Sequence, residues 1–447
     1  RLANARRSGQ LGARAHQAAH LGVRNRARLA VMPASPPPTA IPGAIVRPAL
    51  VYAVQFGAIG AFVPYISIYL GAAGLDLGTV GALIALHAAV SVVAAPSWGA
   101  LADGVGDVRG PLLAAGALSG LAAALIAVAV GPFSLALGIV LLAAASAGMI
   151  PMIDSRAVRM AGHRDRFGRA RAWGSAAFIV IAFATGAALG RFGPVGLFLL
   201  YGPLLVVTGL AAWVLLRLPD DDAAAGPDGR RARRRRIGRV AGMALAALSP
   251  TTILSVVRRP GIGPFFVASV VIWSSHAALQ SFVSLRLLDL GADATVVAAT
   301  WSIGALVEVP LMFVFPSLAR RFGPERLVAV GGIAFGLRAA ISALAVAPEP
   351  IVIGSVFGGV GFAFVYIGTV SWVAGAVPRS AQATAQGIFT GTATSVGAIA
   401  GSIVGGVIGG ALGLPFLFGL AAAGYAAGGL IVWATIGPGR SRLVESH

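Results

Sequence analysis

The sequence has no cysteine and no lysine, and only 11% of its 447 residues are charged. Without cysteine, neither a disulfide framework nor a thiolate metal site is possible. The sequence also has no P-loop and no ATP-binding cassette signature, so it does not indicate ATP-driven pumping within this chain. We expect no cofactor and no metal site.

The residues that are abundant are apolar: they make up 57% of the chain, and the mean hydropathy is +0.86. These values are typical of an integral membrane protein, whose principal surroundings are the lipid bilayer. The net charge of +19 would suit a nucleic-acid partner. The arginines, however, occur in short tracts between apolar runs and not on one soluble domain, so we interpret them as signals of membrane topology and expect no nucleic-acid partner.

Twelve apolar segments are long enough to cross a bilayer, which takes about 20 residues of helix. We expect α-helices, because open strands would leave backbone groups unpaired in lipid. The predicted spans are 49–70, 77–100, 111–130, 133–153, 171–190, 194–216, 264–287, 294–318, 327–347, 350–377, 383–410 and 413–436.

The connections between these spans alternate in charge. Arginine occurs after the second, fourth, sixth, eighth and tenth spans and in the tail, whereas the opposite connections carry none except Arg191. Positively charged loops stay in the cytoplasm. The sequence therefore predicts a multi-pass protein of a bacterial-type cytoplasmic (inner) membrane with both termini in the cytoplasm.

An arginine-rich central loop divides the spans into six and six. We predict a basic, disordered N-terminal tail at residues 1–47 and a first six-helix bundle at 48–216. A linker at 217–262 leads to a second six-helix bundle at 263–436, and a short tail at 437–447 follows. The apolar stretch 240–257 is interpreted as an interfacial helix or buried linker, because a thirteenth span there would place the later arginines on the wrong side. Met32 resembles a natural start, which would make residues 1–31 an extension.

An internal repeat supports this division. The segments 99–109 and 316–326 each lie between the second and third span of their half, and Leu, Ala, Gly and Arg recur in them at the same offsets. Internal duplication of this kind is typical of secondary transporters.

The first of these segments resembles the signature of the major facilitator superfamily, approximately G-x-L-A-D-x-x-G-x-x-R. The matching residues are Gly99, Leu101, Ala102, Asp103, Gly106 and Arg109, and the second copy retains Gly323 and Arg326. The resemblance covers residues 48–436. It implies two pseudo-symmetric six-helix bundles around a cavity that opens alternately to each side, with Asp103 in a conformational latch. A charged turn in a short loop is the alternative, and Arg320 replaces the expected acidic residue in the second copy.

A closer resemblance concerns residues 165–178, "DRFGRARAWGSAAF". This stretch resembles the proton-coupled sugar permeases related to lactose permease, and the phenylpropionate permease and nucleoside proton symporter-like families. The resemblance implies that a carboxylate near the end of the fourth span and an arginine of the fifth engage the substrate. By position these are Asp154 and Arg171. Arg171 is alternatively an ordinary snorkelling residue of the cytoplasmic boundary.

Glu308 interrupts the apolar stretch 301–316. A charge at mid-membrane depth costs at least about 2.5–3.5 kcal/mol, so such a residue usually faces a cavity or a partner. Glu308 and Arg338 lie at similar distances from the loop they share, about 16–20 Å along their helices, and we expect that they can pair. In the lactose permease group an acidic residue of the eighth span and an arginine of the ninth serve proton coupling, which the resemblance implies for this pair. A permanent structural ion pair is the alternative.

Other cavity candidates are less specific. His276 and Gln55 are candidate substrate ligands, as is Trp173, which could instead mark the membrane interface. His276 and His87 could relay protons or be satisfied by neighbouring helices. The tenth span contains no His or Glu, unlike that of lactose permease, so lactose is not expected as the substrate.

These observations predict a secondary active transporter that moves a small organic solute by alternating access, with proton-coupled uptake as the preferred mode. The same fold also supports efflux of drugs or metabolites, and a sensor or scramblase. An intramembrane enzyme is the less favoured alternative, because the polar residues within the spans are single and spread over both halves. One chain contains both halves of the pathway, so we expect a monomer to function.

Overall fold

We analysed a computed structural model of the full chain. It describes residues 43, 45–161, 164–218, 258, 262–376, 386, 389 and 393–436. The predicted tails, most of the linker 217–262 and the stretch 240–257 lie outside these residues, as does residue 32.

The described part of the chain is all helical, and no strand occurs in it. The first half contains α2 (Val46–Phe62), α3 (Ile66–Ala72), α4 (Leu77–Val105), α5 (Arg109–Ala127), α6 (Pro132–Ser146), α7 (Met149–Ala161), α8 (Arg164–Phe192) and α9 (Gly196–Leu215). The second contains α12 (Ile262–Asp289), α13 (Ala294–Phe322), α14 (Pro324–Leu344), α15 (Pro348–Ala376), α17 (Thr394–Leu412) and α18 (Leu414–Ile436).

Twelve helical segments among the described residues are long and apolar enough to cross a membrane, which confirms the predicted number. Two of them consist of paired helices. Pro64 interrupts the first span between α2 and α3, because proline has no N–H to continue the helical bonds. The fourth span divides near Gly148, where a Cβ would lie 2.6 Å from Trp98 Cγ. That span continues to Ala161, eight residues beyond the predicted end.

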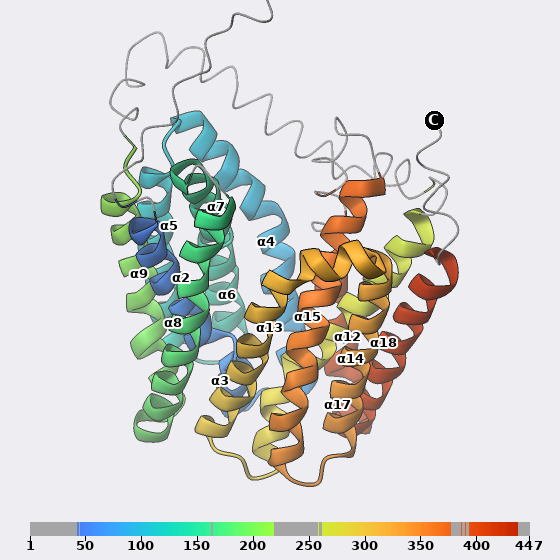
Figure 1. Ribbon diagram of the computed structural model, residues 1–447. Coiled ribbons are helices and arrows are strands. Elements are labelled where there is room, and N and C mark those ends of the chain that lie inside the picture. The colour runs from blue at the N-terminus through green and yellow to red at the C-terminus, as the bar shows by residue number, and fades with distance from the viewer. Residues whose placement is uncertain are drawn as a thin grey trace, which may run out of the picture. The chain divides into compact units, whose positions relative to one another are not determined.

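The two halves repeat one packing scheme (Figure 1). In the first half α2 contacts α8 and α9, α5 contacts α6 and α9, and α4 contacts α6. In the second half the same five contacts recur between the equivalent helices: α12 with α17 and α18, α14 with α15 and α18, and α13 with α15. This repetition gives the internal repeat seen in the sequence a three-dimensional counterpart.

Helix capping is repeated as well. The Asp76 carboxylate accepts a hydrogen bond from Thr79 N at the start of α4, and Asp293 accepts from Thr295 N and Val296 N at the start of α13. These bonds satisfy N–H groups that have no partner within the helix. Hydrogen bonds from Thr79 also hold the pKa of Asp76 below its usual range.

The two ends of the bundle differ in charge, because successive spans run in opposite directions. We call one end the arginine-rich end; it carries Arg47, Arg109, Arg217, Arg320, Arg321 and Arg326. We call the other the capped end, because it carries the caps Asp76 and Asp293.

The two halves contact each other at the capped end. The start of α4 lies on the second part of α17, where a Cβ on Gly406 would lie 2.5 Å from Leu77 O. The Tyr65 hydroxyl lies 2.8 Å from Ala182 O of α8 and 3.0 Å from Ala294 O of α13. The glycine-rich sequence of α17 thus serves close helix packing, as its small residues indicate.

Candidate functional site

A cavity of about 1090 Å³ lies between the halves. Helices α2, α3, α4, α6, α7 and α9 line it on one side, and α12, α13 and α17 on the other. From the capped end it extends toward the arginine-rich end as far as Pro96, Pro151 and Thr394. None of the described residues that line it is Asp, Glu or Arg. Its polar and aromatic lining includes Gln55, Phe62, His87, Tyr201, Trp273, His276, Gln280 and Trp301.

Asp154 and Arg171 form an ion pair. Arg171 Nη1 donates to Asp154 Oδ1 at 2.9 Å, and the Tyr52 hydroxyl donates to the same oxygen at 2.6 Å. The Arg171 guanidinium also lies 5.0 Å from the ring centroid of Phe56 and 5.8 Å from that of Tyr52. The carboxylate is 34% exposed and the guanidinium side chain 40% exposed. The two predicted residues therefore lie together, and a solute that approaches them can exchange hydrogen bonds with them.

Glu308 lies on α13, which packs against α8, the helix that carries Arg171. Among the described residues Glu308 has no ion pair within 4 Å, so the expected pair with Arg338 is not formed in this structure. The number of residues from the shared loop predicts how deep Glu308 and Arg338 lie along their helices. It does not predict in which direction around the helix axis each side chain points.

Arg338 instead lies within the second half, where it is 5% exposed. It acts electrostatically on His276 and Tyr425. The Tyr425 hydroxyl and His276 Nδ1 lie 3.2 Å apart, and the Tyr425 ring stacks on Phe335 with centroids 4.9 Å apart. His276 lines the cavity, so this buried group lies directly behind the cavity wall.

The remaining candidates lie in different surroundings. Gln55 lines the cavity and its Oε1 is buried without a hydrogen-bond partner. Gln280, which was not among the predicted ligands, also lines the cavity, and its Oε1 is likewise buried without a hydrogen-bond partner. His87 also lines the cavity. Trp173 does not line it and is 63% exposed, which favours the interface interpretation.

The signature loop between α4 and α5 has the conformation that its glycine predicts. Gly106 ends α4 with φ 68°, in the left-handed region that favours glycine, and its N–H donates to Ala102 O. Gly323 holds the equivalent turn before α14 with φ 85°. Asp103 is exposed and has no ion pair among the described residues, and a Cβ on Gly99 would meet nothing within 4 Å.

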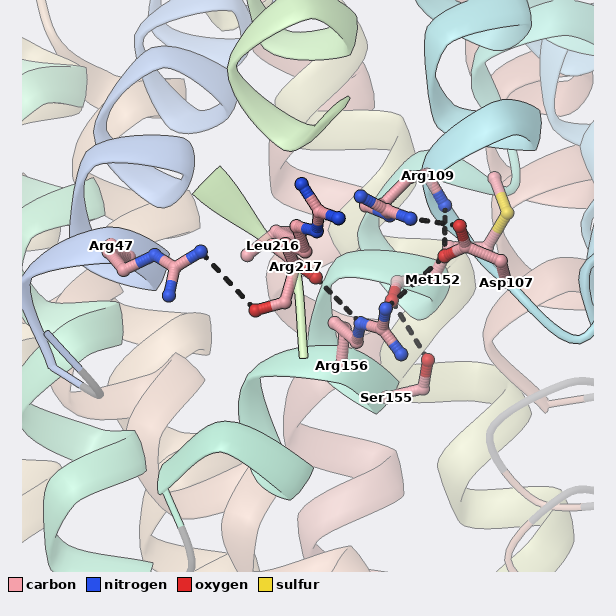
Figure 2. Close-up of polar contacts among 8 residues, drawn as sticks. All are labelled: Arg47, Asp107, Arg109, Met152, Ser155, Arg156, Leu216 and Arg217. Carbon is pink, nitrogen blue, oxygen red and sulfur yellow. Dashed lines mark hydrogen bonds and ion pairs between the residues drawn. The ribbon is translucent and has the colours of Figure 1, made fainter. Parts of the chain in front are cut away.

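Asp107, which the signature does not specify, makes the ionic contacts of this loop (Figure 2). Its carboxylate accepts from Arg109 Nε at 2.9 Å and from Arg156 Nη2 at 3.2 Å. Arg156 is 1% exposed, and its Nε donates to Leu216 O at 2.8 Å.

Two neighbouring contacts extend this network. Arg109 lies 5.3 Å from the ring centroid of Trp213, and Arg47 Nη2 donates to Arg217 O at 3.2 Å. The network joins the loop, α7, the end of α9 and the start of α2. The network was not predicted from the sequence, although two signals point to it: the carboxylate of Asp107 in the loop, and Arg156 within the same span as Asp154.

Comparison with known proteins identifies the family. The MFS_1 like family model matches residues 45–420. The chain belongs to this family of major facilitator superfamily transporters. The predicted resemblance and the absence of an enzymatic function are thereby confirmed, and the protein is a secondary transporter of a small solute.

Relatives within the superfamily agree with this assignment. The maltose permease of Geobacillus stearothermophilus is 28% identical over 287 residues, which is 64% of this chain and 67% of the relative. The crystal structure of the nucleoside transporter NupG has a TM-score of 0.73 at 16% identity and covers 88% of this chain and 99% of that one. A peptide transporter POT in complex with sulfate has a TM-score of 0.65 at 15% identity, with coverage of 90% and 96%. These two structures share the fold.

Proposed function

We propose that this transporter takes up its solute together with protons, and that Glu308 is the residue that exchanges the proton. The observation that carries the proposal is that Glu308 has no ion pair among the described residues and lies on α13, a helix of the second half that packs against α8, the helix of Arg171 in the first half. A titratable group at the boundary that must open and close during alternating access can couple its protonation to that motion.

The charges around Arg171 supply the physical reason. Asp154 and Glu308 together carry two negative charges when ionised, whereas Arg171 carries one positive charge. Because an uncompensated charge within a membrane is expensive, the group is best neutralised by one proton. Asp154 is bonded to Arg171 and to Tyr52, so the proton goes to Glu308, which has no such bond.

The solute is proposed to bind in the cavity between the halves. Gln55 and His276 supply polar contacts within it. Asp154 and Arg171 are not part of its lining, but both are partly exposed and are proposed to bind the solute on its way to or from the cavity. Arg338 contributes from behind His276 and not through a pair with Glu308. We assign no substrate contact to Trp173, because it does not line the cavity.

The conformation is proposed to be inward-facing. The arginine-rich end corresponds to the cytoplasm by the charge distribution of the loops. The halves contact each other at the opposite, capped end, and the cavity extends away from that contact. In the alternate state the signature residues Gly99, Asp103, Gly106 and Arg109, with Gly323 and Arg326 of the second copy, would form the latch at the arginine-rich end.

Proton coupling can be tested in proteoliposomes that enclose a pH-sensitive dye. Maltose, nucleosides and aromatic carboxylates are added outside, and the internal pH is recorded. We expect solute-dependent acidification with the native chain and none with Glu308→Gln, while exchange of labelled solute across the membrane continues. Glu349→Gln is the matched control, since Glu349 is an exposed carboxylate at the start of α15.

Two results would contradict the proposal. Acidification that persists in Glu308→Gln would remove Glu308 from the coupling, and solute movement that is indifferent to pH would make the protein a uniporter. Transport only toward an alkaline exterior or against an imposed inward gradient would indicate exchange of solute for protons, as in an efflux carrier.

A further inference from the structure

Arg338 is a buried cation with no carboxylate partner. Its side chain is 5% exposed, and its Nε makes no hydrogen bond. Among the described residues no acidic side chain lies within 4 Å of it. Buried charges are normally paired and hydrogen-bonded, so an arginine in this state indicates a partner that the chain itself does not supply.

The second half offers no other carboxylate at this depth. Apart from Glu308, its acidic residues between 262 and 436 stand at helix ends: Asp289, Asp293, Glu325 and Glu349. Glu308 itself, on α13, forms no ion pair with Arg338. The missing negative charge therefore does not come from the second half in this conformation.

The guanidinium is held in place by small and uncharged neighbours. A Cβ on Gly358 of α15 would lie 2.8 Å from Arg338 Cδ and 2.9 Å from its Nη1, so only glycine leaves room for the side chain there. His276 and Tyr425 both pack on Phe335, one turn of α14 before Arg338, with ring centroids 4.8 and 4.9 Å away. Because the His276 Nδ1 and the Tyr425 hydroxyl are bonded to each other, one of the two residues can donate to an anion, the histidine through its other ring N–H or the tyrosine through its hydroxyl.

The cavity adjoins this group. His276 lines the cavity and contacts Trp273, another lining residue, with ring centroids 5.3 Å apart. No acidic residue lines the cavity in the described part of the chain, so a negatively charged solute meets no repulsion there. The aromatic surface of Trp273 suits a planar ring beside the charged group.

We propose that Arg338, His276 and Tyr425 form a subsite for a carboxylate of the transported solute, which makes that solute a monovalent organic anion with an apolar or aromatic body. One guanidinium neutralises one negative charge, whereas a divalent phosphate would leave a buried charge uncompensated. This inference rests on the proposed function only in that the solute passes through the cavity.

The first test is the melting temperature of the purified full chain in detergent without solute. If the partner of Arg338 is the solute, the charge is unpaired in the empty protein, and Arg338→Met will melt no lower than the native chain. Arg286→Met is the control. Arg286 also has a buried, unbonded Nε, but its Nη2 donates to Ala345 O at 2.8 Å, so its loss should lower the melting temperature. A fall for Arg338→Met as large as that of the control would overturn the proposal.

The second test compares acetate, benzoate and naphthoate with their neutral amides as probes of binding, measured by thermal stabilisation and by calorimetry. We expect the native chain to bind at least one carboxylate about tenfold or more tightly than its amide, because a charge-assisted hydrogen bond is lost with the amide. The preference should disappear in Arg338→Met and survive in Arg286→Met. Equal binding of acid and amide, a preference that survives in Arg338→Met, or no stabilisation by any of the three carboxylates would each overturn the proposal.

These experiments separate the subsite from proton coupling. The Arg338 variants are assessed by binding and melting, and the Glu308 variants by proton flux. A transporter that couples protons to a neutral solute would retain the Glu308 effect and show no carboxylate preference.

Discussion

Arg156 and Arg338 are both almost fully buried, one in each half, yet their surroundings differ. Arg156 is 1% exposed and bonded to Asp107 and to Leu216 O. Arg338 is 5% exposed, has no ion pair among the described residues and leaves its Nε without a bond. Burial alone therefore does not assign a role to an arginine. A cation that the chain satisfies holds the fold together, and a cation left without a partner is available to a ligand.

The largest expected effect is the loss of stability when Arg156 is replaced. Arg156→Met leaves Asp107 and the carbonyl of Leu216 without their buried donor. We expect a loss of about 2–3 kcal/mol, below the ~3–5 kcal/mol of a fully buried pair, because Asp107 keeps Arg109 and some solvent. Thermal unfolding in detergent measures it.

Arg159→Met is the matched control, because Arg159 is exposed on the same helix and carries the same charge. If both variants melt at the same temperature, the contacts of Arg156 with Asp107 and Leu216 do not contribute to the stability of the protein, and Arg156 has no structural role.

A smaller effect is expected from Gly358→Ala, which moves the Arg338 guanidinium without removing its charge. The added methyl group overlaps the side chain, and overpacking of this kind costs about 1–3 kcal/mol. The carboxylate preference should weaken together with the melting temperature. Gly375→Ala in the same helix is the control, since a Cβ there would meet nothing within 4 Å. A preserved preference in Gly358→Ala would show that the position of the guanidinium does not matter.

The smallest effects are expected at the helix caps, which occur at equivalent positions in both halves. Asp76→Ala and Asp293→Ala each remove a helix cap, and each should lower stability by about 1 kcal/mol. Asp289→Ala should not lower stability and should raise it by about 0.3–1 kcal/mol, because Asp289 stands at the end of α12, where an acidic side chain is unfavourable. Melting curves of the three variants provide the measurement. Unequal losses for the two caps would mean that the halves diverge at their helix starts as they do at their buried arginines.

Several parts of the site could be predicted from sequence because they depend on short-range patterns. The resemblance of residues 165–178 singles out Asp154 and Arg171 as residues that act on one solute, and the signature places a turn at Gly106; the ion pair between Asp154 and Arg171 is seen only in the structure. The direction in which Glu308 points could not be predicted in the same way. A stretch that is apolar on all sides gives no periodic signal of which face meets which helix, and α13 has such a sequence.

Hydropathy, loop charge and local motifs act over short distances along the chain, so the membrane environment, the twelve spans, the duplication into halves and the superfamily follow from the amino-acid sequence. The folded structure is needed to see that Glu308 does not pair with Arg338, that Arg338 lies behind His276 without a carboxylate among the described residues, and that Asp107 with Arg156 makes ionic contacts of the signature loop. These contacts join residues of separate helices, and the rotation of each helix about its own axis is set by packing against its neighbours.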